Sequence, residues 1–279
     1  MQFTTLLLTA TALLGNGALA APSGAAMGHG LAARVATRTQ RQSQPLSRVV
    51  GSASSVEGPV SNGNETAHVE YSSNWSGAVY EEPPSGTFTA VAATITVPVP
   101  TATAAGTYSA SAWVGIDGDT CGTAILQTGV DFTATKSGSR TTYSYDAWYE
   151  WYPDYAYDFS SFSISAGDVI AMSVTSSSST SGVALLENLT TGKSVSKSIT
   201  SSSALCGENA EWIVEDFESN GELVAFADFG TVLFTGASAD TTTETIGTSD
   251  ATLIDIRQGG TVLTSASIPS DSEVEVTYE

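Results

Sequence analysis

From residue 69 onward, apolar and polar side chains alternate with a period of two in many short stretches. This alternation is typical of β-strands with one buried face, and no stretch has a helical period of useful length. Runs rich in Thr, Val and aromatic residues are separated by Gly, Pro and Ser, which favour turns. The strands that this pattern predicts are Val69–Tyr80, Thr87–Val97, Ser109–Ile116, Thr123–Phe132, Thr141–Tyr152, Phe159–Ile164, Val169–Ser176, Gly182–Asn188, Ser194–Ile199, Glu211–Phe217, Thr231–Phe234, Thr252–Arg257 and Glu273–Tyr278. We therefore expect an all-β fold, an antiparallel β-sandwich of two sheets (concanavalin-like or jelly-roll-like) in a single domain.

One predicted hairpin, from Trp113 to Asp131, carries an unexpected set of polar side chains. Its sequence W-V-G-I-D-G-D-T-C-G-T-A-I-L-Q-T-G-V-D reads as two strands joined by a Gly-rich turn. Trp113 and Asp117 share a face of the first strand, and Gln127 and Asp131 share a face of the second. A sheet needs only one apolar face to build a core, so this polar face requires another explanation.

Two more predicted strands combine carboxylates with aromatic or apolar residues on a single face. In Y-D-A-W-Y-E-W-Y-P the shared face contains Asp146, Trp148, Glu150 and Tyr152. In A-E-W-I-V-E-D-F-E it contains Glu211, Ile213 and Glu215. One such row alone would be a solvated face. Three rows in one domain favour a groove that binds an extended polymer, either a peptide or a sugar chain.

The first 68 residues differ in composition from the rest of the chain. Residues 1–20 contain a short apolar run that ends in A-L-A, which predicts a secretory signal peptide and a secreted, extracellular product. Residues 21–68 are rich in Ala, Gly and Ser, and we interpret them as a basic propeptide, with a disordered tail as the alternative. The basic residues of this segment are Arg34, Arg38, Arg41 and Arg48. The folded domain is then expected over residues 69–279.

The chain as a whole is acidic, with a formal net charge of -20 at pH 7. A surface this negative repels phosphate backbones and anionic lipid, which argues against nucleic acids and membranes as partners. No later apolar run is long enough for a membrane anchor. The opposite charges of propeptide and domain suggest that the propeptide covers the domain as an inhibitor. This attraction is expected to weaken in acid as carboxylates become protonated.

Cysteines and glycosylation sequences fit an exported protein. Cys121 and Cys206 are the only cysteines, so we expect one disulfide, with a free reactive thiol as the alternative. The disulfide would close a loop of roughly 85 residues, which contributes about 4–5 kcal/mol in the chain-entropy description. Asn188 begins an N-L-T sequence at a predicted turn and is a candidate glycosylation site. Asn64 would leave with the propeptide, and Asn74, beside a strand, is not expected to be used.

Several catalytic classes are excluded by the residues that the domain lacks. His29 and His68 are the only histidines, and both lie within or at the edge of the proposed propeptide. At most one His remains for Ser-His-Asp or Cys-His catalysis or for a multi-His zinc site, which is too few. The D-T-G and D-S-G motifs of paired-aspartate peptidases are also absent. A calcium site at I-D-G-D-T lacks the spaced ligands of a calcium loop, so we expect a turn there and no metal or cofactor.

Five sequence blocks together resemble the glutamic peptidases (eqolisins), which are secreted mainly by fungi. The blocks are N-W-S-G-A at Asn74, W-V-G-I-D-G-D-T-C with A-I-L-Q-T-G, Y-D-A-W-Y-E-W-Y-P, L-E-N-L-T-T-G-K and A-E-W-I-V-E-D-F-E. The similarity extends from Asn74 to Phe234, whereas residues 235–279 match only loosely. It implies a β-sandwich with a substrate cleft on the concave face of one sheet. The Cys121–Cys206 pair matches a disulfide of the family, but the family's other disulfides have no cysteines here.

The resemblance also implies roles for individual residues. Gln127 and Glu215 match the catalytic pair of the family, and Glu211 is a neighbour of the catalyst. Positions that line the family's cleft match Trp75, Trp113, Asp117, Asp131, Asp146 and Glu150. In the implied reaction, Glu215 takes a proton from the attacking water and passes it to the leaving nitrogen. Gln127 donates to the developing oxyanion and helps to hold the water.

These features predict a secreted acid endopeptidase that acts on protein and peptide substrates without a metal. We expect it to be a monomer that its own propeptide inhibits. Two alternatives remain on the pattern alone. One is a β-sandwich glycosidase that uses two carboxylates such as Glu150 and Glu215, and the other is a carbohydrate-binding module without catalysis.

Overall fold

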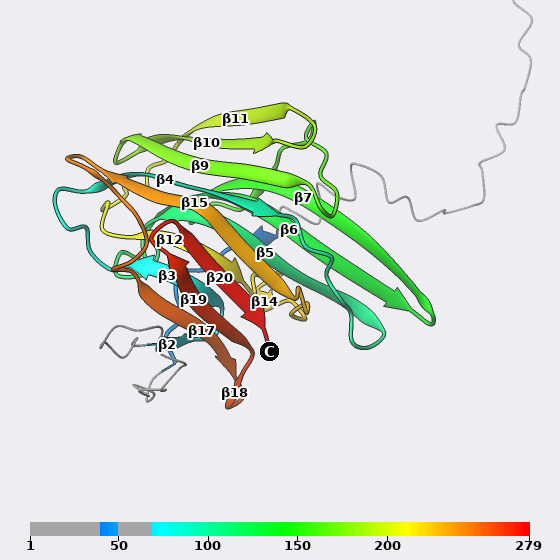
Figure 1. The fold of residues 1–279 in the computed structure, drawn as a ribbon. Coiled ribbons are helices and arrows are strands. Elements are labelled where there is room, and N and C mark those ends of the chain that lie inside the picture. Colours follow the sequence, from blue (N-terminus) through cyan, green and yellow to red (C-terminus); the bar gives the residue numbers. More distant parts are fainter. Residues whose placement is uncertain (1–39, 50–68) are drawn as a thin grey trace, which may run out of the picture.

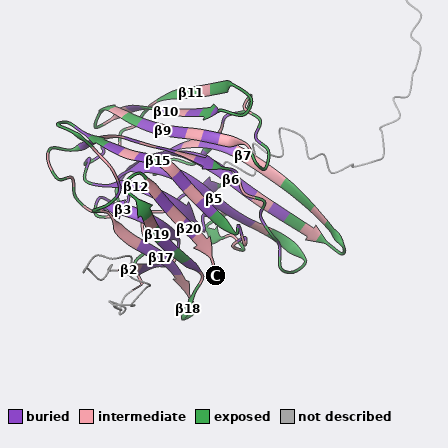
Figure 2. Ribbon diagram, viewed as in Figure 1, coloured by how far each residue is buried: buried purple, intermediate pink, exposed green. Residues whose placement is uncertain are grey.

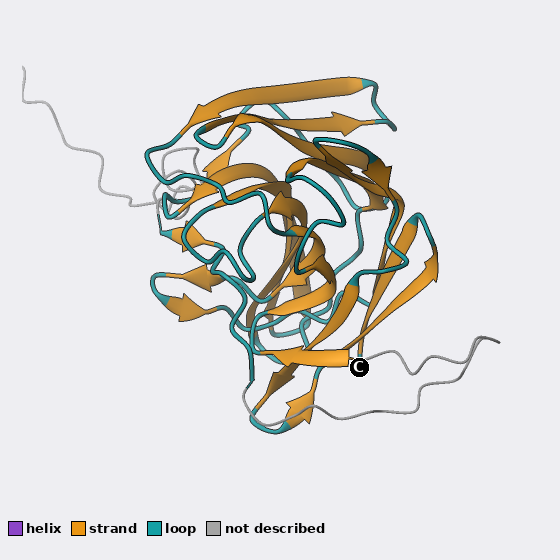
Figure 3. Ribbon diagram, turned by 90° about the vertical axis from the view of Figure 1, so that its left-hand side faces the viewer, coloured by secondary structure: helices purple, strands orange, loops and turns teal. Residues whose placement is uncertain are grey.

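The computed structural model describes residues 40–49 and 69–279, and every regular element in these ranges is a strand (Figures 1 and 3). No helix in these ranges is long and apolar enough to cross a membrane. The proposed signal peptide and most of the proposed propeptide lie outside the described residues. The strands are β1 (Arg41–Gln42), β2 (Val69–Ser72), β3 (Trp75–Tyr80), β4 (Phe88–Thr96), β5 (Gly106–Ile116), β6 (Ile125–Ser137), β7 (Arg140–Tyr152), β8 (Tyr157–Asp158), β9 (Val169–Ser178), β10 (Ser181–Asn188), β11 (Lys193–Thr200), β12 (Ala210–Glu215), β13 (Glu218–Ser219), β14 (Glu222–Leu223), β15 (Thr231–Thr241), β16 (Thr245–Ile246), β17 (Thr252–Gln258), β18 (Thr261–Val262), β19 (Thr264–Ser270) and β20 (Glu273–Tyr278).

Two large sheets form the sandwich (Figure 1). The eight-stranded sheet has the order β11-β10-β9-β4-β15-β20-β19, and β16 pairs with β15. The nine-stranded sheet has the order β18-β17-β3-β12-β5-β6-β7-β8, and β2 pairs with β17. Neighbouring strands run antiparallel in both sheets, apart from the parallel pair of β2 and β17. The predicted antiparallel β-sandwich is therefore confirmed.

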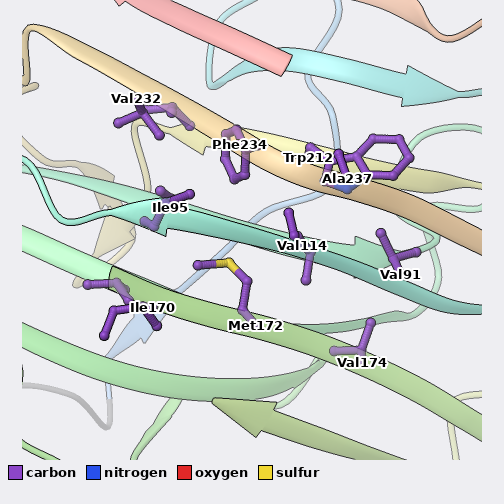
Figure 4. Packing of buried hydrophobic residues seen from close by; sticks show 14 of the residues in the cluster. Val91, Ile95, Val114, Ile170, Met172, Val174, Trp212, Val232, Phe234 and Ala237 are labelled. Atoms are coloured by element: carbon purple, nitrogen blue, oxygen red, sulfur yellow. The ribbon is translucent and has the colours of Figure 1, made fainter. Parts of the chain in front are cut away.

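The main core lies between the two sheets, as the period-two alternation requires. Val114 on β5 and Trp212 on β12 face Val91 on β4 and Phe234 on β15 across this layer (Figure 4). The indole nitrogen of Trp212 donates to the backbone carbonyl of Ala92, 3.0 Å away, and so links the sheets directly. Buried residues concentrate along the central strands, whereas β11 is mostly exposed (Figure 2).

Most of the predicted strands are present, with a few differences that have local causes. The stretch Phe159–Ile164 forms turns instead of a strand, because the Phe159 carbonyl accepts a hydrogen bond from the Phe162 amide. The stretch Val69–Tyr80 is divided at Ser73 and Asn74 into β2 and β3. Strand β19 was not predicted, since it is mostly polar and has only Thr264 and Ala266 buried among its seven residues.

The expected disulfide is present between Cys121 and Cys206. It connects the turn after β5 to the loop before β12, which are 85 residues apart in the sequence. The free-thiol alternative is therefore contradicted, because neither cysteine among the described residues is free.

The surroundings of Asn188 disfavour a glycan at this candidate site. The residue is only 1% exposed, and its amide nitrogen donates to the Asp168 carboxylate at 2.9 Å. A glycan on that nitrogen would have no space and would break the hydrogen bond. Asn74 is also buried, which agrees with the expectation that its N-W-S sequence is not used.

Candidate active site

The three polar rows predicted from the sequence lie side by side on one face of the nine-stranded sheet. This face is opposite the main core, because alternate residues of the same strands point between the sheets. The strand registers place the residues of β12, β5, β6 and β7 in three parallel lines. The lines are Glu215–Ser111–Asp131–Asp146, Ile213–Trp113–Gly129–Trp148 and Glu211–Gly115–Gln127–Glu150.

Glu215 occupies the end of β12 and is fully buried. One carboxylate oxygen accepts a hydrogen bond from the indole nitrogen of Trp113 at 3.0 Å, and the other accepts one from the backbone amide of Gln44 at 3.1 Å. Trp75 supports this arrangement, since its ring meets that of Trp113 edge-on with centroids 4.9 Å apart. Burial raises the pKa of Glu215 to about 7, although the nearby Arg41 guanidinium acts in the opposite direction.

Gln127 is also fully buried, and neither atom of its amide has a hydrogen-bond partner among the described residues. Both carboxyl oxygens of Glu211 also lack a hydrogen-bond partner among the described residues. Gly115 lies between the two side chains, where a Cβ would be 2.6 Å from a Glu211 oxygen and 3.3 Å from the Gln127 Cβ. Buried polar groups without protein partners are rare and point to a site for water or ligand. Burial also raises the pKa of Glu211 well above its ordinary range, so this carboxyl is neutral in acid.

Asp131 and Glu150 form a buried pocket that holds a single cation. The Arg41 guanidinium lies 3.1 Å from an Asp131 oxygen and 3.0 Å from a Glu150 oxygen. Its central carbon Cζ lies over the rings of Trp148 and Phe217, at 3.9 Å and 4.6 Å from their centroids. These cation–π contacts stabilise the bound guanidinium in addition to the two ion pairs. Asp146 is half-buried beside Asp131 in the register of β6 and β7.

Asp117 lies at the edge of this face, in a left-handed turn with φ of 69°. Its two carboxylate oxygens accept hydrogen bonds from four consecutive backbone amides, at residues 206–209. Asp117 therefore holds the loop that carries Cys206, and among the described contacts it does not touch residues 40–49. The turn that was predicted at I-D-G-D-T is present here.

Residues 40–49, which we call the strap, run across the three rows. Strand β1 at the start of the strap pairs with β13, and the Ala156 amide donates to the Arg41 carbonyl at 3.1 Å. In the middle of the strap, the Ser43 amide donates to Glu150 at 3.2 Å and the Gln44 amide donates to Glu215 at 3.1 Å. Gln127 lies opposite Glu150 in the register. The main chain at Ser43–Gln44 is therefore held by Glu215 and by Glu150, the residue opposite Gln127.

The far end of the strap is held by Asn74 and by a surface ion-pair cluster. The Asn74 side chain contacts three main-chain groups of the strap. Arg48 pairs with Glu70, Glu81 and Asp119, but its side chain is 39% exposed, so these pairs are weaker than those of Arg41. Sequence reasoning did not identify Asn74 as a site residue. Its N-W-S-G-A block contributed to the family resemblance, but the Asn74 side chain itself was considered only as a glycosylation site.

The pKa values of Glu215 and Glu150 reflect two opposing effects. Burial raises the pKa of Glu215 to about 7 and that of Glu150 well above its ordinary range. The contacts that the strap supplies act in the opposite direction: Arg41 lowers both pKa values, the Ser43 amide lowers that of Glu150, and the Gln44 amide lowers that of Glu215. These contacts favour the ionised carboxylates and become weaker when the carboxyls are protonated. The release of the strap in acid stays a prediction.

Comparison with known protein families places most of the chain in one group. A model of the peptidase A4 family matches residues 73–278. Aspergillopepsin-2 from Aspergillus niger is 52% identical over 232 residues, which cover 77% of this chain and 80% of that protein. Scytalidopepsin B from Scytalidium lignicola is 41% identical over 287 aligned positions, which cover all of both chains.

Solved structures give the same result. Scytalido-glutamic peptidase, determined with a peptide-based transition state analog, is 45% identical and superimposes with a TM-score of 0.65. The match covers 74% of this chain and 98% of that one. Aspergilloglutamic peptidase from Aspergillus niger is 60% identical with a TM-score of 0.57, and the match covers 62% of this chain and 99% of that one.

Proposed function

We propose that this protein, which belongs to the peptidase A4 family and is a glutamic endopeptidase, cleaves peptide bonds with Glu215 and Gln127 as its catalytic pair. The observation that carries this assignment is the position of a backbone amide of the chain itself, the amide of Gln44, at 3.1 Å from the Glu215 carboxylate. A substrate in the same place would present the nitrogen of its scissile bond to the group that must protonate it.

The reaction follows from the atoms that surround Glu215. As a carboxylate it takes a proton from a water molecule while the water oxygen attacks the scissile carbonyl. The carbonyl oxygen becomes an oxyanion that accepts a hydrogen bond from the Gln127 amide NH₂. Glu215 then gives its proton to the leaving nitrogen, the C–N bond breaks, and the products are a carboxylic acid and an amine. Trp113, which donates to Glu215 at 3.0 Å, fixes the carboxylate throughout.

Activity in acid is part of the proposal. The raised pKa of Glu215 results first from its burial, which the Arg41 guanidinium of the strap opposes. When the strap leaves, water reaches the carboxylate and its pKa falls toward the ordinary value of about 4.3. Glu215 is then partly ionised in mild acid, and the other carboxylates of this acidic chain lose part of their mutual repulsion.

The strap supports the further proposal that the propeptide inhibits the enzyme before maturation. It covers Glu215 and fills the pocket between Asp131 and Glu150 with Arg41, so a substrate has no access. Protonation of Glu150 and Glu215 in acid weakens their contacts with the strap, and we propose that activation also requires cleavage of the chain between the strap and β2. We also propose that the protein is secreted through its N-terminal signal and that the enzyme is a monomer.

The substrate class can be tested with the protein after maturation in acid. The enzyme is incubated near pH 4 with a denatured protein and, separately, with oligosaccharides of several linkages. New peptide termini with intact sugars support the proposal. Cleavage of sugars alone would favour the glycosidase alternative, and cleavage of neither would leave only a binding module.

Replacement of Gln127 by Ala is expected to lower kcat by about 10²–10³-fold, the effect of losing one oxyanion donor. Its stability is expected to change little, because the amide forms no hydrogen bond with the described residues. The measurement is kcat on a cleaved peptide, together with thermal unfolding of the variant. A kcat within twofold of the unsubstituted enzyme would remove Gln127 from the catalytic pair.

A further inference from the structure

Asn74 has no assigned role, yet it holds the strap more extensively than any catalytic residue does. Its amide nitrogen lies 3.3 Å from the Gln44 carbonyl and 3.2 Å from the Pro45 carbonyl. Its amide oxygen accepts a hydrogen bond from the Ser47 backbone amide at 2.9 Å. All three partners are main-chain groups, so the contacts do not depend on the side chains of the bound segment. This is the pattern by which a protein binds an extended peptide of any sequence.

The Asn74 side chain is also held by a contact that does not involve the strap. Its oxygen accepts a hydrogen bond from the hydroxyl of Ser72 on β2 at 2.9 Å. Its own backbone amide donates to the same hydroxyl at 3.0 Å. Little side-chain freedom is therefore lost on binding, which favours affinity.

Asn74 is also tied directly to the catalytic strand. Its carbonyl accepts a hydrogen bond from the backbone amide of Asp216, the residue that follows Glu215, at 2.9 Å. Gln258 on β17 donates to the carbonyl of Ser73 at 2.8 Å and to the Asp216 carboxylate at 2.7 Å. The distance from Asn74 to Glu215 is thus set by a short network of hydrogen bonds.

The strap gives the direction in which these contacts run. The Gln44 amide lies at Glu215, and the groups that Asn74 holds all come after that amide along the chain. The Leu46 amide, on the same side, donates to the Gly118 carbonyl at 2.9 Å. In a substrate with the same direction, the residue at Gln44 supplies the leaving nitrogen. Asn74 then contacts the first, second and fourth residues of the leaving fragment.

We propose that Asn74 is a substrate-binding residue that holds the main chain of the leaving fragment, C-terminal to the scissile bond. The proposal rests on the proposed function of Glu215. An amide suits this role in acid, because it both donates and accepts hydrogen bonds and does not titrate. Occupation of Asn74 positions the leaving nitrogen at Glu215, so longer substrates gain in kcat/KM.

The test uses the full chain after maturation in acid and two peptides with the same cleaved bond. One peptide ends one residue after the bond, and the other ends four residues after it. The unsubstituted enzyme is expected to prefer the longer peptide. Asn74→Ala removes two to three hydrogen bonds to the longer peptide and is therefore expected to lower its kcat/KM by about tenfold or more. The kcat/KM for the shorter peptide is expected to change much less. Equal losses for both peptides would overturn the proposal.

A second measurement keeps the proposal testable if Asn74→Ala does not fold. The backbone nitrogen of the fourth residue after the bond is methylated in the longer peptide, which removes the group equivalent to the Ser47 amide. The unsubstituted enzyme is expected to cleave this peptide several-fold more slowly. No effect there, with a loss on methylation before the cleaved bond, would mean that substrates bind in the reverse direction. If the unsubstituted enzyme cleaved neither peptide, the proposed function itself would fail.

Discussion

Replacement of Glu215 by Gln is expected to lower kcat on peptide substrates by about 10³-fold or more. The amide keeps the size of the side chain and can still accept a hydrogen bond from Trp113, but it cannot take a proton from water or return one to the leaving nitrogen. KM is expected to change much less, since the carboxylate acts mainly in the transition state. The measurement is steady-state cleavage of one peptide near pH 4, with circular dichroism and thermal unfolding of the variant.

A matched control is Glu187→Gln, which makes the same chemical change at an exposed position on β10 of the other sheet. Its kcat is expected to stay within twofold of that of the unsubstituted enzyme. A folded Glu215→Gln variant as active as this control would refute the catalytic assignment.

The second large effect is expected for Arg41→Ala in the precursor. Arg41 is 3% exposed and is paired with Asp131 and Glu150, and removal of one partner of a buried ion pair typically costs about 3–5 kcal/mol. Water can enter the emptied pocket and solvate the two carboxylates, so we expect a smaller loss here. The binding free energy of the strap should fall by about 2 kcal/mol, which corresponds to a roughly 30-fold lower binding constant. The uncleaved precursor is then expected to cleave a test peptide at least about 30-fold faster than the unsubstituted precursor.

Arg48→Ala is the matched control for this experiment. Its side chain is 39% exposed, and exposed ion pairs contribute about 0–1 kcal/mol, so the precursor should gain less than about fivefold in rate. Gel electrophoresis during the assay verifies that the chain is still intact. Equal rates for the Arg41→Ala, Arg48→Ala and unsubstituted precursors would show that the strap does not block the site.

The sheets and the three polar rows could be predicted from the sequence because they depend on local periodicity. Alternation placed Trp113, Gln127 and Glu215 on strand faces, and the structure has all three on one face. The order of the strands in the sheets could not be predicted from local periodicity. Glu215 lies on β12 beside β5 although the two strands are about ninety residues apart along the chain, and no local pattern encodes that pairing.

The strap shows a second limit of local reasoning. Charge indicated that a basic segment faces an acidic domain, but four arginines were available and nothing in the sequence distinguished Arg41. Arg41 is the buried arginine because it enters a pocket formed by Asp131 on β6, Glu150 on β7 and the ring of Trp148. The raised pKa values of Glu150 and Glu215 were equally inaccessible from the sequence, because burial causes these shifts and burial is a tertiary property.

The central claim is that Gln127 and Glu215 act as one unit on the same bond. The most direct test measures single-turnover cleavage of one peptide by Gln127→Ala, Glu215→Gln and the double variant. Residues that act together have strongly non-additive effects, so we predict that the double variant is no more than about threefold slower than Glu215→Gln alone. If the two single losses instead multiplied in the double variant, the two residues would act independently, and the account of a catalytic pair would be contradicted.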